Sequence, residues 1–212
     1  MRFFKKYWWV GVSAIVLIIL YFVFFSGPKV EYAELNKEPH ISGNPESSVV
    51  LVEWSDFQCP ACGLAFPIVQ DILAKYDDRI KFQYRHLPLV KLHAYAYRAA
   101  EASECAADQG KFWEYHDLLF ANQKSLTRSD LKLYAGRVEG LEVDLWNDCL
   151  ASGVKRKIVD ADLAEADKQG YNSTPTFLLN GQKVSDWSAL PQIVEQMIEP
   201  LVPLRQATST TQ

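Results

Sequence analysis

The stretch WSDFQCPACGLAF, residues 54–66, contains two cysteines with two residues between them, after an apolar run and before a helical pattern. The run before it, SVVLVEW (48–54), is rich in β-branched residues and nearly continuous in apolar character. That pattern is typical of a strand buried on both faces. Behind the cysteines, Phe66, Val69 and Leu73 recur at helical spacing and predict an amphipathic helix. We therefore expect a strand-to-helix turn that carries two thiols.

The rest of the chain predicts the fold that contains this turn. IKFQYRHL (80–87) has the character of a second strand, and residues 91–169 have helical patterns throughout. The strand period returns in TPTFLLNGQKV (174–184), where Asn180-Gly181 is a strong signal for a two-residue hairpin. A βαβ half, a helical middle and a hairpin half together predict an α/β fold with an inserted helical subdomain.

Capping residues give the expected ends of several helices. Ser129 is expected to cap a helix that ends before Gly140, because a hydroxyl at that position can accept from a free backbone N–H. Gly170 is expected to end the last helix of the middle segment. Ser188 is expected to cap a closing amphipathic helix in SALPQIVEQMIEPLV (188–202).

The amino-terminal segment predicts a membrane anchor. Residues 7–25 form an uncharged run of 19 residues, long enough to cross a hydrocarbon core as a helix. Arg2, Lys5 and Lys6 precede it, so the positive-inside rule leaves the amino terminus in the cytoplasm and the rest outside. We expect residues 1–28 to be a cytoplasmic stub and single transmembrane helix. The alternative is a cleaved signal peptide, which the large aromatic residues at the end of the run suit poorly.

The composition of the residues after the apolar run limits the kinds of protein that this expected exported part can be. Residues 29–46 are polar with Gly and Pro, which predicts a tether; 47–203 are predicted to form one domain and 204–212 a disordered tail. Three of the 22 Lys and Arg residues precede the apolar run, whereas all 26 Asp and Glu residues follow it. This acidic balance argues against a nucleic-acid partner. Four cysteines, an even number, suit an oxidising compartment such as the periplasm or the cell surface.

Five blocks of this sequence resemble thioredoxin-fold proteins of the DsbA-like type: GNP before the first strand, EWSDFQCPACG, YRHLPL, GKFWEYHDLLF and NSTPTFLLNG. The resemblance covers about residues 43–200. A bare CxxC is weak evidence, but CxxC with a distant Thr-Pro at the start of a strand, together with these intervening blocks, is highly specific. The resemblance implies a thioredoxin fold interrupted by a helical insertion at about 91–169, in agreement with the pattern of the residues.

The CPAC motif has the features of a redox pair. Pro60 suits the first position of a helix, which places Cys59 at the N-terminus, where unpaired N–H groups and the helix dipole favour a thiolate. Cys62 lies about one turn further on, close enough to form a disulfide. We expect Cys59 to be the exposed, attacking thiol and Cys62 to resolve the mixed disulfide. A structural disulfide, or two buried thiols, is the alternative.

A metal site is not expected from the sequence. A closed zinc site typically needs four ligands in two spaced pairs, and the histidines offer no close His/Cys pair to match CPAC. Gly63 rather than His follows Cys62, which excludes c-type haem attachment. We therefore expect no metal and no cofactor. The four histidines are His40, His86, His93 and His116.

The resemblance implies three further site residues. The bond before Pro175 is expected to be cis and to lie against CPAC, with the backbone of Thr174 left to pair with an extended substrate peptide. Glu53 matches a buried acid of the family that assists proton transfer at the resolving cysteine, and burial would raise its pKa. The alternative is a strand-end Glu53 that faces solvent.

The remaining candidates have structural interpretations. Asp56 is expected to be a turn or cap residue rather than a catalyst. Cys105 and Cys149 fall in the helical insertion and are expected to form a structural disulfide; the alternatives are two free buried thiols or a redox relay to CPAC. Core or structural positions, rather than a substrate groove or catalysts, are expected for Trp54, Phe57, Phe66, His86 and His93.

These motifs predict thiol–disulfide exchange by an anchored, extracytoplasmic catalytic domain. The preferred function is an oxidase that introduces disulfides into exported proteins or peptides and is reoxidised by a membrane redox partner linked to quinone. Ala61 stands where strong oxidants of the family carry His, so an oxidant of intermediate strength is expected. Two alternatives stay open: an isomerase or reductase kept reduced by a membrane electron donor, and a non-enzymatic assembly or metal-delivery module.

Overall fold

The computed structural model of the chain describes residues 39–199. The expected anchor (1–28), the first part of the expected tether and the expected tail (204–212) lie outside the described residues. Within 39–199, no helix combines the length and apolar character that crossing a membrane requires. The expected transmembrane helix therefore stays a prediction.

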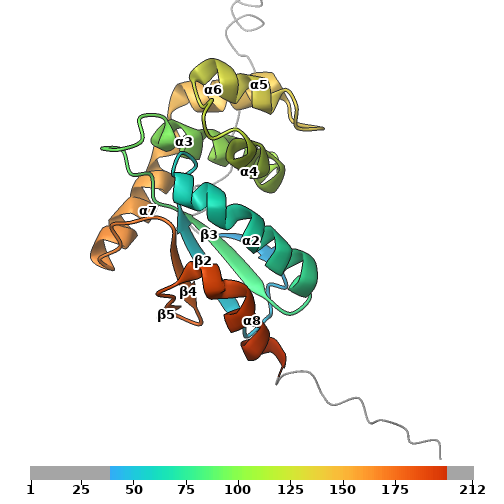
Figure 1. The fold of residues 1–212 in the computed structure, drawn as a ribbon. Coiled ribbons are helices and arrows are strands. Elements are labelled where there is room, and N and C mark those ends of the chain that lie inside the picture. Colours follow the sequence, from blue (N-terminus) through green and yellow to red (C-terminus); the bar gives the residue numbers. More distant parts are fainter. Residues whose placement is uncertain (1–38, 200–212) are drawn as a thin grey trace, which may run out of the picture. The chain divides into compact units, whose positions relative to one another are not determined.

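A five-stranded mixed sheet is the centre of the described residues (Figure 1). Its strand order is β1-β3-β2-β4-β5. β2 and β3 are parallel neighbours, as a βαβ unit requires, whereas the other pairs are antiparallel. The strands are β1 (His40–Gly43), β2 (Val50–Ser55), β3 (Lys81–His86), β4 (Thr176–Leu179) and β5 (Gln182–Lys183).

The first strand corrects the expected tether. β1 lies inside 29–46 and pairs antiparallel with β3, with His40 opposite Tyr84. Gly43 ends the strand with a φ of +77°, and a side chain there would collide with the carbonyl oxygen of Ile80. The short polar segment HISG carries no strand alternation of its own, so only its pairing with β3 makes it a strand.

The helices have the expected division into a core layer and an insertion. In Figure 1, α2 and α8 lie over one face of the sheet, and the inserted helices α3 to α6 gather at one end of it. The inserted subdomain expected at 91–169 is confirmed. The helices are α2 (Pro60–Tyr76), α3 (Ala96–Ala107), α4 (Phe112–Ala121), α5 (Arg128–Ala135), α6 (Val143–Ser152), α7 (Arg156–Lys168) and α8 (Leu190–Ile198), with a 3-10 turn η1 at Trp187–Ala189.

Three local expectations need correction. The buried stripe of α2 contains Cys62 and Val69, whereas Phe66 and Leu73 are only half-buried, because the helix turns its cysteine face toward the sheet. Thr127, not Ser129, caps α5, in a capping box with Asp130. Side-chain capping near the closing helix comes from Asp186, which accepts from Ser188 N ahead of η1, rather than from Ser188.

Two glycine-based predictions are confirmed. Gly170 follows α7 with a φ of +73°, the left-handed conformation expected where a helix ends. Asn180 and Gly181 have φ values of 48° and 79° and connect β4 to β5. Positive φ at both central residues is the requirement of the tightest hairpin turn, so this hairpin follows from the sequence.

The sheet buries a different layer on each face. On one face, Trp54 packs with Leu87 and with Ala166 of α7, and Val52 adds to this cluster. Because side chains alternate along a strand, Leu51 and Glu53 point to the opposite face, which α2 covers. A polar residue on a core strand is thus directed toward the helix that begins at CPAC.

Candidate active site

The two thiols of CPAC stand at the start of α2. Cys59 is the N-cap, with extended backbone angles, and Pro60 takes the first helical position. The N–H groups of the first turn have no partner within a helix, so they point their positive ends at the Cys59 sulfur. Cys62 lies one turn further on, and both cysteines are free thiols.

The two thiols differ sharply in acidity. The hydrogen bond from the Cys62 thiol, together with the backbone N–H groups of Ala61 and Cys62, lowers the pKa of Cys59 to about 5 against the opposing effect of burial. Burial raises the pKa of Cys62 far above its ordinary value, and its hydrogen bond to Cys59 and the nearby Glu53 carboxylate raise it further. This arrangement makes Cys59 the thiolate of the pair and keeps Cys62 protonated.

The exposure of Cys59 is lower than the sequence led us to expect. Cys59 is 6% exposed and Cys62 is 0% exposed. The expectation of an exposed Cys59 is therefore wrong for the structure as it stands, because the loop of Thr174 covers the sulfur. The order of access still favours Cys59 over Cys62.

The loop before β4 supplies that cover. The Thr174–Pro175 peptide bond is cis, as the resemblance implied. The Cys59 thiol donates to the carbonyl oxygen of Thr174 at 3.4 Å. The Thr174 hydroxyl is buried and has no hydrogen-bond partner within residues 39–199. Residues 115 positions apart in the sequence therefore meet at the reactive sulfur.

Glu53 is buried beneath CPAC. It is 3% exposed, so the alternative of a solvent-facing side chain is wrong. Among the described residues, its Oε1 has no hydrogen-bond partner. Burial raises the pKa of Glu53 to about 7, although the Ser55 side chain acts in the opposite direction. A carboxyl group with this pKa can gain or lose a proton near neutrality.

Asp56 has the structural role that the sequence favoured. One of its carboxylate oxygens accepts from the N–H of Gln58 at 2.7 Å, and the other accepts from the N–H of Leu89 at 2.8 Å. The latter oxygen also contacts His93 Nδ1 at 2.7 Å. Asp56 thus ties the active-site turn to the loop that follows β3.

Gln123 is a site residue that the sequence did not indicate. Its side-chain amide donates to the carbonyl oxygens of Phe57 at 3.0 Å and Cys59 at 2.9 Å. A side chain at Gly63 would collide with this amide, so the glycine of CPACG leaves the space that Gln123 fills. The only signal in the sequence was that glycine.

The aromatic neighbours of CPAC lie in the core or at its edge, as expected. Trp54 and Phe57 are buried, and the half-buried Phe66 stacks on Phe120 with ring centroids 5.1 Å apart.

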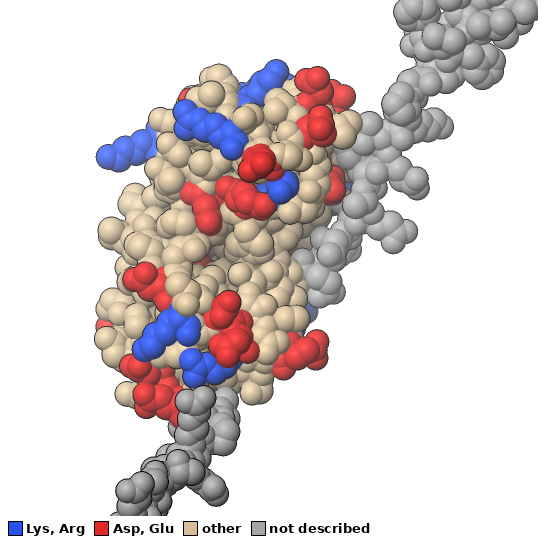
Figure 2. Space-filling model, turned by 90° about the vertical axis from the view of Figure 1, so that its right-hand side faces the viewer, with Lys and Arg blue, Asp and Glu red and all other residues tan. Residues whose placement is uncertain are grey.

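On the face of the molecule shown in Figure 2, acidic and basic side chains are interspersed at both ends, and uncharged side chains lie between. That face has no continuous basic surface for a nucleic acid.

The second cysteine pair is separate from CPAC. A disulfide joins Cys105 of α3 to Cys149 of α6, with Cα atoms 5.8 Å apart. Both cysteines are buried. The alternative of two free thiols is therefore wrong for this structure, and the bond links two helices of the insertion.

One group of side chains outside CPAC could hold a metal ion. The ligand atoms of His40, His86 and Glu104 all lie within 4.8 Å of one another. The spacing of these three residues in the sequence predicts no such group, since His40 lies in the expected tether. The pairing of β1 with β3 brings His40 to the other two residues.

Comparisons with known proteins give the family and the fold that the structure shows. A family model described as Thioredoxin matches residues 35–199. The fold is similar to that of oxidised BdbD from Bacillus subtilis, with a TM-score of 0.68 and 22% identity over 77% of this chain and 92% of that one. A thioredoxin-like oxidoreductase from Silicibacter pomeroyi has a TM-score of 0.66 and 27% identity over 76% of this chain and 92% of that one.

Curated relatives give a match of another kind. Na(+)/H(+) antiporter NhaA 3 of Salinispora tropica and Na(+)/H(+) antiporter NhaA 1 of Salinispora arenicola are each 43% identical over 144 residues. These residues are 68% of this chain and 22% of each relative. The chain therefore spans about a fifth of the length of the curated relatives it matches.

Proposed function

We propose that this chain, which belongs to the thioredoxin family and is a DsbA-like thiol–disulfide oxidoreductase, is an oxidase that forms disulfides in exported proteins. The observation that carries the proposal is the unequal acidity of the CPAC thiols, with the pKa of Cys59 lowered to about 5 and that of Cys62 raised. A stabilised Cys59 thiolate favours the reduced form of the enzyme, and an enzyme whose reduced form is favoured oxidises its clients.

The oxidation proceeds in two exchanges. A client thiolate attacks Cys59 Sγ in the Cys59–Cys62 disulfide; a client–Cys59 bond forms and Cys62 leaves with the electron pair. A second client thiolate then attacks the client sulfur of this mixed disulfide. Cys59 leaves as a thiolate, the client disulfide is complete, and two electrons remain on the reduced enzyme. In the reverse direction, Cys59 attacks and Cys62 resolves.

Glu53 would provide the proton that the first exchange requires. Cys62 leaves as a thiolate in a buried place where its charge is disfavoured. A carboxyl group with a pKa of about 7, buried under the same helix, can protonate that sulfur and take the proton back during reoxidation.

Thr174 and Pro175 would bind the client backbone beside Cys59. The contact of the Thr174 carbonyl with the Cys59 sulfur places this loop where an extended peptide must pass to reach the thiol. A client that binds there would displace the cover over Cys59 and pair with the backbone of the loop. The low exposure of Cys59 then restricts reaction to thiols carried by a chain that opens the loop.

The cellular setting is part of the proposal. The uncharged run at residues 7–25 and the cations before it support an anchored protein with its catalytic domain outside the cytoplasm. A membrane partner linked to quinone would accept the two electrons from the reduced pair. The antiport activity named for the curated relatives is not proposed for this chain, because the match covers only 22% of the length of those relatives.

The thiol state of CPAC in cells tests the direction of electron flow. Cells are quenched with acid, and free thiols are alkylated with a reagent that adds a resolvable mass to each cysteine. An oxidase is expected to carry the Cys59–Cys62 disulfide at steady state. A dithiol at these positions would instead support an isomerase or reductase kept reduced by a membrane electron donor.

A further inference from the structure

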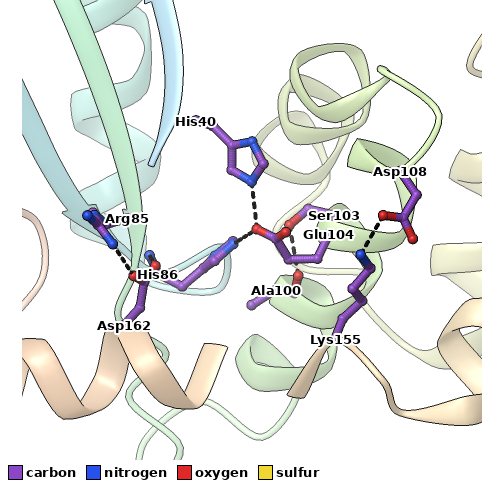
Figure 3. Close-up of polar contacts among 9 residues, drawn as sticks. All are labelled: His40, Arg85, His86, Ala100, Ser103, Glu104, Asp108, Lys155 and Asp162. Carbon is purple, nitrogen blue, oxygen red and sulfur yellow. Dashed lines mark hydrogen bonds and ion pairs between the residues drawn. The ribbon is translucent and has the colours of Figure 1, made fainter. Parts of the chain in front are cut away.

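Three side chains from separate elements converge beside the sheet. His40 comes from β1, His86 from the last position of β3, and Glu104 from α3. Figure 3 shows both imidazole rings directed at the Glu104 carboxylate. The distances to Glu104 Oε1 are 2.6 Å from His40 Nε2 and 2.8 Å from His86 Nε2. Two imidazole nitrogen atoms and one carboxylate oxygen atom thus face one another, and each of them can bind a metal ion.

The surrounding structure fixes these rings. His86 and Glu104 are buried, and the other ring nitrogen of His86 has no hydrogen-bond partner. The Nε2 contact is therefore the one polar interaction that orients the His86 ring within the described residues. The His40 ring stacks on Phe112 with centroids 3.5 Å apart, and pairing of β1 with β3 fixes its backbone.

One side of the group is open. A cavity of about 340 Å³ has both His40 and Glu104 in its wall. Asp108 and Lys155, which form an ion pair, line the same cavity. The His40 side chain is 22% exposed, so an ion can enter along its edge. The cavity has room for water molecules to complete the coordination of an ion.

We propose that His40 Nε2, His86 Nε2 and Glu104 Oε1 bind one divalent transition-metal ion of the zinc type. Two imidazoles and one carboxylate suit zinc, whereas calcium and magnesium prefer ligands that are all oxygen. Three protein ligands leave the fourth position to a water molecule in the cavity. Ligand atoms around tetrahedral zinc lie about 3.3 Å apart, so the Glu104 carboxylate must withdraw by roughly 0.5 Å on binding.

The bound ion would join parts of the fold that the thiol chemistry does not use. It would connect the edge strand β1 and the inserted helix α3 to the end of β3. Its effect is therefore expected on stability and on the attachment of the insertion to the sheet. The proposal is independent of the direction of electron flow at CPAC.

Zinc titration of the full chain tests the site. The Cys59–Cys62 pair is first oxidised to its disulfide, so that no free thiol competes for the ion, and bound metal is removed with a chelator. Calorimetry is expected to show one zinc ion per chain, and zinc is expected to raise the unfolding temperature. Zinc K-edge absorption should show two imidazole ligands. Absence of stoichiometric zinc binding would overturn the proposal and leave a hydrogen-bonded group only.

Matched histidine variants make the test specific. His40→Gln is expected to weaken zinc binding at least tenfold and to remove one imidazole from the absorption spectrum. His40 is partly exposed, so this variant tests the site without opening the core. His93→Gln is the control, because His93 also contacts a carboxylate and its side chain is 17% exposed. Equal zinc affinity of His40→Gln and the unmodified chain would contradict the assignment.

Discussion

The sulfur atoms of CPAC differ in acidity because burial raises the pKa of Cys62, whereas the hydrogen bond from Cys62 lowers the pKa of Cys59. The Cys62 thiol is the largest contribution to the lowered pKa of Cys59. We therefore expect iodoacetamide to label Cys59 first, with a pH midpoint near 5. Cys62→Ala should move that midpoint upward while trapping mixed disulfides with clients, since no resolving thiol is left. Peptide mapping of the alkylated chain measures both. Faster labelling of Cys62 would reverse the assigned roles.

Glu53 makes stability depend on pH. Its pKa in the folded chain is about 7, against 4.5 as the ordinary value, so the folded state holds the proton more tightly than the unfolded state. Stability should therefore fall as the pH rises from about 4.5 to 7, by roughly 3 kcal/mol in all. Glu53→Gln should be more stable than the unmodified chain at pH 8 and similar at pH 4. Urea unfolding at the two pH values measures this, and equal stabilities at pH 8 would contradict a buried, uncompensated carboxyl group.

The same variant separates a proton-transfer role from a structural one. If Glu53 provides the proton that Cys62 takes up in the first exchange, Glu53→Gln should slow formation of the client–Cys59 mixed disulfide from the oxidised enzyme by tenfold or more near pH 7. The alkylation midpoint of Cys59 should change little. An unchanged rate of mixed-disulfide formation would leave Glu53 with an effect on stability alone.

At the scale of elements, the segment after α4 holds the start of α2. Gln123 donates to two loop carbonyls beside CPAC. Gln123→Ala should reduce the free energy of unfolding by about 1–3 kcal/mol, because the carbonyl oxygen of Phe57 loses this donor and that of Cys59 keeps only the N–H of Gly63. It should also slow exchange at Cys59. Gln109→Ala is the matched control, since Gln109 donates to the carbonyl of Glu142 on the exposed surface. The control should cost less stability and leave exchange unchanged. An equal effect of both variants on exchange would contradict a positioning role for Gln123.

The disulfide between α3 and α6 should behave differently from CPAC. It closes a sequence separation of 44 residues, for which chain entropy predicts a stabilisation of about 4 kcal/mol. Cys105→Ala with Cys149→Ala should lower the unfolding temperature and leave exchange at Cys59 nearly intact. Mild dithiothreitol should free two thiols, at positions 59 and 62, in the folded chain. A double variant that is stable but cannot be reoxidised would instead make this pair a relay.

Local patterns in the sequence predict some elements of this fold and not others. The turn at CPAC, the Asn180-Gly181 hairpin and the end of α7 at Gly170 each follow from a few adjacent residues. Thr174 and Pro175 could be assigned only through the resemblance, because nothing local shows that they reach Cys59. β1 was missed because its four residues become a strand only through pairing with β3.

The side-chain groups that cross the fold were beyond the reach of local patterns. Glu104 lies 64 residues from His40 and meets it only because the sheet and the insertion are packed together. Gln123 likewise contacts Cys59 across 64 residues. In each case, sequence spacing has no direct relation to distance in space, so the structure had to place the residues.

At the scale of the whole molecule, the topology proposal has a direct test. A reporter that is active only outside the cytoplasm is fused after Gln212 and should be active in cells. The protein should also stay with washed membranes, because residues 7–25 are expected to anchor it. Recovery of a soluble species shortened by about 25 residues would instead show cleavage of a signal peptide.

The two borders of the sheet have a consequence for the proposed action on unfolded client chains. An unpaired strand border can recruit a client's strand and start co-aggregation. Here β5 contains only the exposed residues Gln182 and Lys183, too short and polar to act as such a template. At the other border, the Trp113 indole donates to the carbonyl oxygen of Ile41, which removes one acceptor from β1. Under the proposed function, the short β5 and the Trp113 contact would lower the risk that a client is captured as an extra strand.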